Sequence, residues 1–266
     1  MAAVQGLAAP ARVKVGVCGS PDNFEKAVAA GFEYYEPSAA VVSGLGEAQY
    51  AAFRDRVLSS KIRCECFNGL IRTDKVVGPE VDLARVSEYL ERTLSRCKEL
   101  GATIAVWGSA SSRNVPDGFS RDQAWSQIKI FLGQAGEIAR RKGIVIAIEP
   151  LRKQESNIIN TGAEALRLVN EVHHPQVQMI IDYYHMRVEN EDPEILKTAR
   201  EHIVHLHFAN PNGRKWPKSE AEDPVYGRFF ELVKSTGFAG GLSIEGSGTF
   251  EADAEASLAF FRKELS

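Results

Sequence analysis

Four apolar runs in the second half of the chain each end on a side chain that can bind a metal ion or move a proton. The run IVIAIE ends on Glu149, and VQMIID ends on Asp182. The run IVHLHF carries His207 near its end, and GLSIE ends on Glu245. Short continuous apolar runs are typical of buried parallel strands. Each run therefore predicts a strand that carries a chemically capable side chain to its carboxyl end.

The carboxyl ends of parallel strands lie together at one edge of a sheet, and neighbouring strands are about 5 Å apart. Four consecutive strand ends can therefore reach one ion. Three carboxylates and one imidazole make a mostly hard ligand set, and they belong to Glu149, Asp182, His207 and Glu245. We expect one divalent ion, with Mn²⁺ as the first choice and Mg²⁺, Co²⁺ or Zn²⁺ as alternatives. His205 shares the parity of His207 and should lie one layer below it.

Eight strand–helix units fill the 266 residues. Strict alternation predicts a parallel sheet with crossover helices, and eight units in this length favour one closed (β/α)₈ TIM barrel over an open doubly wound sheet. We expect strands at 13–19, 32–37, 62–68, 103–108, 144–149, 177–182, 203–208 and 241–246. We expect helices at about 21–30, 47–60, 81–100, 120–142, 161–172, 193–200, 223–236 and 252–265.

Composition shows no break along the chain, so we expect residues 1–266 to form a single domain, with 1–11 as a loose N-terminal arm rather than a signal peptide. The net charge of −3 and the lack of a dense basic run argue against nucleic acid as a partner. No stretch approaches 18 continuous apolar residues, which argues against a membrane span. The four cysteines form no CxxC pair, which favours a reducing cytoplasm over a disulfide framework.

Four short motifs resemble those of the xylose-isomerase-like superfamily of sugar phosphate isomerases and epimerases. They are EP at 149–150, DYYH at 182–185, HLHFAN at 205–210 and SIEG at 243–246. Within that superfamily they are most similar to the ketose 3-epimerase group, which contains tagatose and psicose epimerases. The resemblance implies a TIM barrel, a sugar or keto-sugar substrate, and one divalent ion held by the four residues named above.

The resemblance also implies three substrate-binding residues. Glu155 stands six residues after the first ligand, and His185 stands three residues after Asp182. The third is Arg214, which stands seven residues after His207, where the family spacing is six. Either the loop carries an insertion or another residue takes this role.

An epimerisation or isomerisation of this kind removes a proton from a carbon beside a carbonyl, through an enediolate that the metal stabilises. Strands five and eight lie three apart around a barrel, so their carboxylates approach the ion from different sides. We therefore expect Glu149 and Glu245 to act as acid and base as well as ligands.

Three other functions remain as alternatives. A lyase, such as an inosose dehydratase or a 3-keto-glycoside-cleaving enzyme, would use the same residues and end in elimination. An abasic-site endonuclease of the same superfamily needs further histidines from earlier strands, but all six histidines lie between 173 and 207. A sugar-binding protein without activity would not need both Glu149 and Glu245. A homo-oligomer is a further expectation, because the outer helices of such barrels often pair.

Several other side chains receive no role in the reaction from the sequence alone. Trp107 and Phe67 form either an apolar wall of the site or part of the core. Glu36 is expected to be structural, and Trp216 is expected to be exposed. Arg72 and Arg113 lie in loops, where the default is a solvated charge.

Overall fold

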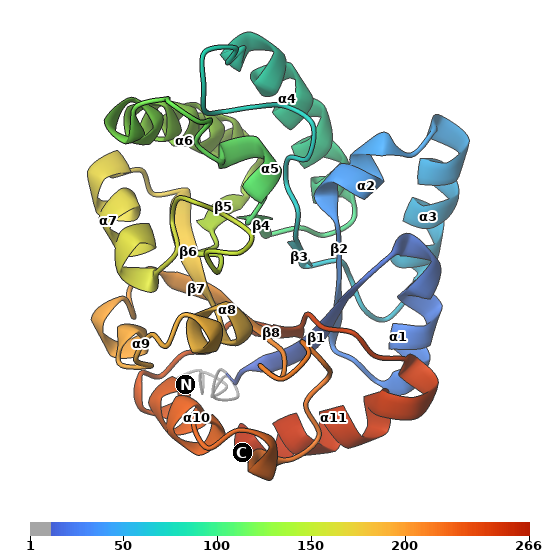
Figure 1. Cartoon of the computed structure of the whole chain (residues 1–266). Coiled ribbons are helices and arrows are strands. Elements are labelled where there is room, and N and C mark those ends of the chain that lie inside the picture. The colour runs from blue at the N-terminus through green and yellow to red at the C-terminus, as the bar shows by residue number, and fades with distance from the viewer. Residues whose placement is uncertain (1–11) are drawn as a thin grey trace, which may run out of the picture.

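The structure is a computed structural model that describes residues 12–266. Eight parallel strands form one sheet in the order β2-β1-β8-β7-β6-β5-β4-β3. The strands surround a central axis and the helices lie outside them (Figure 1). Their bounds are β1 Lys14–Gly19, β2 Tyr34–Pro37, β3 Cys66–Phe67, β4 Ile104–Trp107, β5 Val145–Ile148, β6 Val177–Asp182, β7 Ile203–Phe208 and β8 Gly241–Ile244. The predicted TIM barrel is confirmed, and the predicted arm at 1–11 lies outside the described residues.

The barrel is nearly closed, and its seam lies between β2 and β3. Strand β3 contains two residues, whereas the sequence predicted a strand over 62–68. The residues just before β3 form backbone hydrogen bonds first to one side and then to the other. Arg63 O accepts from Tyr35 N of β2, and Cys64 N donates to Leu100 O, which precedes β4. An isolated bridge between Ser38 and Asn68 joins the two edges. The strand prediction was therefore too long, because this segment bonds to both neighbours without a continuous ladder.

The predicted helices are present, with ends shifted by a few residues. Ser120 caps α6 by accepting from Gln123 N, and Gly143 ends it with a φ of 64°. The helices are α1 Phe24–Ala30, α2 Ala39–Gly44, α3 Glu47–Ser59, α4 Leu83–Glu99, α5 Ala110–Arg113, α6 Arg121–Lys142, α7 Gly162–Val172, α8 Tyr183–Val188, α9 Ile195–Thr198, α10 Tyr226–Ser235 and α11 Phe250–Glu264, with 3₁₀ turns η1 Pro21–Asn23 and η2 Glu220–Glu222. Helices α2, α5 and α8 were not predicted, because such short helices leave no apolar periodicity in the sequence.

Alternate residues of each strand face the barrel interior. A small cluster fills this interior and is separate from the main core between sheet and helices; it consists of Tyr34, Cys66, Val106, Ala147 and Ile180. Glu36, Glu149 and Asp182 follow two residues after members of this cluster, so they lie one layer closer to the carboxyl ends of the strands. Among residues 12–266, no helix is long and apolar enough to cross a membrane.

Candidate metal centre and active site

Four strand ends bring their polar side chains to one point, which we call the upper cluster. One potential ligand atom from each member lies within 4.8 Å of the others, and the members are Glu149, Asp182, His207 and Glu245. The first three are buried, with Glu149 4% exposed, and Glu245 is partly exposed. The sequence placed these residues on consecutive strands, and the structure brings all four together.

The orientation of His207 is set from below by Glu36. His207 Nε2 lies 2.8 Å from Glu36 Oε1, and His205 Nε2 lies 2.9 Å from Glu36 Oε2. A carboxylate only accepts, so we assign the Nε2 proton of both rings to these bonds. His207 Nδ1 then faces Glu149 Oε1 at 3.0 Å and Glu245 Oε2 at 3.4 Å. A lone pair that faces two carboxylates requires a cation between them, either a proton or a metal ion.

Glu36, His205, Ser243 and Tyr34 form a second group beneath the first, which we call the lower cluster. Ser243 Oγ donates to Glu36 Oε2 in a short hydrogen bond and lies 2.7 Å from Tyr34 Oη. All four side chains are buried. Both oxygens of Glu36 therefore already have donors, and the lower cluster is a satisfied network.

Asp182 has two different oxygens. Oδ1 accepts from Tyr184 N at 2.7 Å and caps α8, which follows β6 directly. Oδ2 is buried and has no hydrogen-bond partner among the described residues, and the same is true of His185 Nε2. The two atoms lie 3.5 Å apart, and Arg214 Nη2 lies 3.8 Å from Asp182 Oδ2, beyond hydrogen-bond distance. Buried polar atoms are rarely left unpaired, so this pair indicates a ligand that approaches both.

The electrostatics of the upper cluster fit a divalent cation. Burial raises the pKa of Glu149, and it raises the pKa of Asp182 to about 6. Burial also disfavours the charge of Glu245, but the neighbouring His207 and Arg214 outweigh it and hold its pKa at about 2. The pKa of His207 is well above its usual value, because Glu36 and Glu245 outweigh its burial. Glu149 and Asp182, whose ionisation is disfavoured by burial, gain most from a nearby cation. Three oxygens with one imidazole nitrogen suit Mn²⁺, Mg²⁺ or Co²⁺.

A hollow of about 480 Å³ opens above the upper cluster, and Glu149, Glu245, Glu155, His185 and Arg214 all line it. The structure thus places the three predicted substrate-binding residues beside the two predicted acid/base residues. His185 Nδ1 accepts from the backbone of Arg152 at 3.2 Å, which leaves Nε2 toward Asp182.

Arg214 reaches the hollow in spite of its unexpected spacing. Its Nη2 lies 2.7 Å from Glu245 Oε2, and its Nη1 lies 3.5 Å from Glu155 Oε1. The turn that carries it is closed by a hydrogen bond from Asn210 N to Lys215 O, and Arg214 itself has a φ of 49°. In this turn Gly213 and Arg214 both have left-handed backbones, and the Arg214 guanidinium lies in the site.

Two further residues at the site did not stand out in the sequence. Asn68 donates from Nδ2 to Glu245 Oε1 at 3.2 Å. A Cβ added to Gly108 would lie 1.7 Å from Glu149 Oε2, so only glycine leaves room for this carboxylate. Glycine at a strand end signals such a close approach, and the signal was present in TIAVWG.

Two side-chain predictions were wrong. Arg113 is fully buried rather than solvated, because its guanidinium donates to Trp107 O at 3.0 Å and to Glu149 O at 2.7 Å. Trp216 is 5% exposed, since its ring packs edge-on against Phe32 and Phe250.

Trp107 and Phe67 belong to the core and do not line the hollow, whereas Arg72 lines the hollow and is exposed. Glu36 is buried and hydrogen-bonded, which fits the predicted structural role, and it also fixes the His207 ring.

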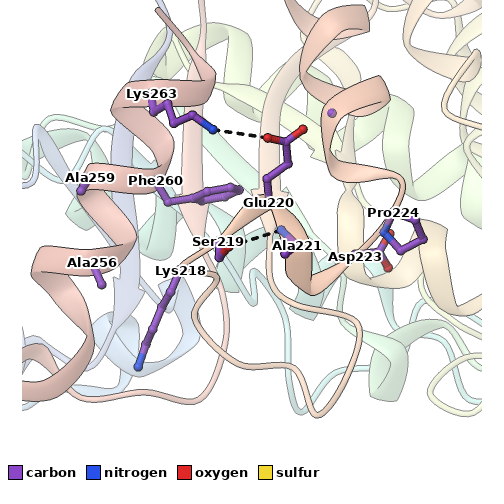
Figure 2. A pocket seen from close by; sticks show the side chains of 11 residues that line it. Lys218, Ser219, Glu220, Ala221, Asp223, Pro224, Ala256, Ala259, Phe260 and Lys263 are labelled. Carbon is purple, nitrogen blue, oxygen red and sulfur yellow. Dashed lines mark hydrogen bonds and ion pairs between the residues drawn. The ribbon is translucent and has the colours of Figure 1, made fainter.

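A larger hollow of about 810 Å³ lies elsewhere, between α11 and residues 218–227 (Figure 2). Lys263 and Glu220 form an ion pair across it, and Phe260 lies on its wall (Figure 2). None of the clustered carboxylates lines it. Its size alone does not make it a reaction site, because the upper cluster lies elsewhere, at the carboxyl ends of the strands.

Sequence comparison agrees with this geometry. The family described as xylose isomerase-like TIM barrel matches residues 24–264. The chain belongs to this family. A 3-dehydro-D-guloside 4-epimerase of Escherichia coli is 28% identical to this xylose isomerase-like barrel over 244 residues, which cover 87% of the chain and 90% of the relative. A D-psicose 3-epimerase of Agrobacterium fabrum is 26% identical over 196 residues, which cover 71% of the chain and 67% of the relative.

Solved structures show the same fold. A D-psicose 3-epimerase crystallised in the presence of D-fructose superimposes on the barrel with a TM-score of 0.83 at 20% identity, covering 95% of this chain and 99% of that one. The apo form of a 3-keto-D-glucoside 4-epimerase from E. coli gives 0.79 at 20% identity, covering 95% and 100%. Since its sequence relatives are named epimerases, this member of the family is an enzyme of the isomerase and epimerase class.

Proposed function

We propose that this enzyme is a divalent-metal-dependent epimerase that inverts a carbon next to the carbonyl of a keto-sugar. The observation that carries the proposal is the convergence of Glu149 and Glu245, from strands three apart, on the lone pair of His207. Two carboxylates on opposite sides of one bound carbon are what inversion requires, since the proton must leave one face and return to the other.

In the proposed reaction, one carboxylate accepts the proton from the carbon beside the carbonyl. The electron pair of the broken C–H bond moves into the carbonyl and gives an enediolate. The other carboxylate donates a proton to the opposite face of the same carbon, and the carbonyl re-forms. A divalent ion, when bound by the upper cluster, would supply Lewis-acid stabilisation of the oxygen that gains charge. We propose Mn²⁺ as the first choice.

The remaining side chains of the hollow would hold the sugar. His185 Nε2 is buried without a partner in residues 12–266 and is available to a substrate oxygen. Arg214 and Glu155 offer donors and acceptors to hydroxyl groups at the rim. Arg214 also stacks over Tyr184, with 4.9 Å from its guanidinium carbon to the ring centre, which fixes its position.

The names of the relatives support the choice of substrate class. One acts on a 3-dehydro-guloside and others on ketoses such as psicose and ribulose. These compounds share a C–H bond next to a ketone, which is the bond that the paired glutamates can attack. We also expect a homo-oligomer, because the outer helices of such barrels often pair.

Incubation with ketoses, an inosose and a 3-keto-glucoside in heavy water, followed by NMR, tests the proposal. We expect deuterium at the carbon next to the carbonyl, together with the epimer. An unsaturated product would indicate a lyase that uses the same carboxylates. Turnover of none of these compounds in the presence of Mn²⁺ would contradict the proposed function.

A further inference from the structure

A second hollow adjoins the one above the upper cluster. It measures about 540 Å³ and lies among α2, residues 72–74 and the first half of α4. Arg72 lines both hollows. Helix α2 and the segment with Arg72 follow the ends of β2 and β3, so the second hollow lies on the same face of the barrel as the site. A molecule longer than one sugar ring can therefore extend from one hollow into the other past Arg72.

Arg72 is held at the border between the hollows. Its backbone oxygen accepts a hydrogen bond from Ser111 Oγ at 3.0 Å. Its Nε would lie 3.7 Å from a Cβ placed on Gly69, a residue that lines the first hollow. The guanidinium thus lies beside the first hollow, while the side chain also forms part of the second.

The second hollow carries more positive than negative charge. Three arginines line it, Arg72, Arg85 and Arg92, against Asp74 and Glu88. Arg85 is paired with Asp74 at 2.6 Å. Within residues 12–266, Arg72 and Arg92 form no ion pair and both are exposed.

The other arginine of the first hollow differs in this respect. Besides Arg72, the first hollow is lined by Arg214, whose Nη2 lies 2.7 Å from Glu245 Oε2 and whose Nη1 lies 3.5 Å from Glu155 Oε1. The second hollow therefore keeps two guanidinium groups available to an anion from outside the chain.

An apolar wall faces these charges. Ala40, Val41 and Tyr89 contribute to it, and Val41 is one of the large apolar side chains that stay exposed, at 39%. The Tyr89 hydroxyl donates to Leu70 O at 2.9 Å, which fixes the ring against the hollow. An apolar wall beside free guanidinium groups suits a group that has both a hydrocarbon body and an acidic end.

We propose that the second hollow is a subsite for a substituent joined to the reacting sugar, and that this substituent carries a carboxylate or a phosphate. The substrate class is then an anionic keto-glycoside rather than a free ketose. This inference rests on the proposed function, because it assumes that the sugar ring occupies the first hollow. Arg72 and Arg92 bind the acidic group, and the wall with Tyr89 binds the body.

Calorimetric binding of three stable glucosides tests the subsite without any need for turnover. The aglycones are phenyl, 4-carboxyphenyl and 4-(phosphonooxy)phenyl, which differ only in the acidic end. The proteins are the wild type, Arg72→Ala, Arg92→Ala and the control Arg200→Ala. The exposed Arg200 lies at a hollow lined by Ile203 and Gly240, at the amino ends of β7 and β8 and so on the opposite face of the barrel from the site. The readout is the ratio of neutral to anionic Kd within each protein, so that general changes in affinity cancel.

We expect the wild type and Arg200→Ala to bind at least one anionic glucoside about tenfold more tightly than the phenyl glucoside, since one charge-assisted hydrogen bond is worth about that factor. Arg72→Ala and Arg92→Ala should each lower this ratio, because each removes one of the two guanidinium groups that bind the acidic end. The inference is overturned if the wild type shows no preference for either anion, binds none of the three, or keeps its preference in both variants. If the wild type prefers the anionic glucosides but incorporates no deuterium in the heavy-water assay, the proposed reaction is contradicted and the subsite is not.

Discussion

The two histidines of β7 lie two residues apart and face the same interior, yet their surroundings are opposite in kind. His205 belongs to the lower cluster, where each oxygen of Glu36 has a donor. His207 reaches the upper cluster, where Asp182 Oδ2 and nearby His185 Nε2 have no hydrogen-bond partner among the described residues. A satisfied network holds its own members in place, whereas a cluster with unpaired buried atoms is built for something that comes from outside.

The comparison also shows why the lower cluster is the poorer metal site, although it has suitable atom types. Cys66 lies close to Glu36 and His205, and Cys18 lies close to Glu36 and His207. Burial raises the pKa of both thiols well above its usual value. A thiol that keeps its proton is a weak ligand, and the oxygens of Glu36 are already engaged.

The largest effect is expected from the two glutamates of the upper cluster. Glu149→Gln and Glu245→Gln should each lower the rate of solvent deuterium incorporation by about 10³-fold, because a general acid or base is lost. Mass spectrometry or NMR of the recovered sugar measures this rate. Glu255→Gln, an exposed position on α11, serves as the control. Deuterium incorporation at the wild-type rate in both variants would show that Glu149 and Glu245 do not transfer the proton.

Gly108→Ala should come next, since the new methyl group would occupy the position of the Glu149 carboxylate. A displacement of about 1 Å at a reacting group can cost on the order of 10²-fold in rate. We expect kcat to fall by that order while circular dichroism shows a folded barrel. The matched control is Gly133→Ala in α6, where an added Cβ meets nothing within 4 Å. Equal activity of the two variants would show that Glu149 needs no such space.

Glu36→Gln tests whether the lower cluster serves the upper one. An amide can donate as well as accept, so it no longer fixes the Nε2 proton of His207, and Nδ1 loses its defined lone pair. We expect the affinity for Mn²⁺ to fall by about 10–100-fold, as for other residues that orient a metal ligand. Calorimetric titration of the metal-stripped protein gives this value directly, independently of activity.

Recovery of the affinity in Glu36→Asp, but not in Glu36→Gln, would separate positioning from a general loss of structure. An unchanged Mn²⁺ affinity in Glu36→Gln would mean that the two clusters act independently.

The smallest effect is expected for Ser243→Ala. It removes one donor to Glu36 and one partner of Tyr34, and both hydrogen bonds are buried. We expect a loss of about 1–3 kcal/mol in unfolding free energy, because buried groups are left without a partner. Urea denaturation measures the change, and Mn²⁺ affinity should fall less than in Glu36→Gln. A larger fall in Mn²⁺ affinity in Ser243→Ala than in Glu36→Gln would contradict the view that Ser243 acts on His207 only through Glu36.

The barrel and the four upper-cluster residues could be read from the sequence because both follow from local patterns. Apolar runs mark strands, and their last residues share one edge. The partners from distant strands could not be read in this way. Glu36 and His207 are 171 residues apart in the sequence, and Asn68 and Glu245 are 177 residues apart. The burial of Arg113 also depends on two backbone carbonyls that only the folded loop brings within reach.

The most direct test of the account is a Mn²⁺ titration of the metal-stripped enzyme in heavy water with a keto-sugar that it binds. Deuterium incorporation next to the carbonyl is followed by NMR in the wild type, Glu149→Gln and Glu245→Gln. We predict that incorporation in the wild type rises with Mn²⁺ and saturates near one ion per chain, and that both variants stay near zero. Incorporation that is independent of metal, or that persists in both variants, would contradict the upper cluster as the reaction centre.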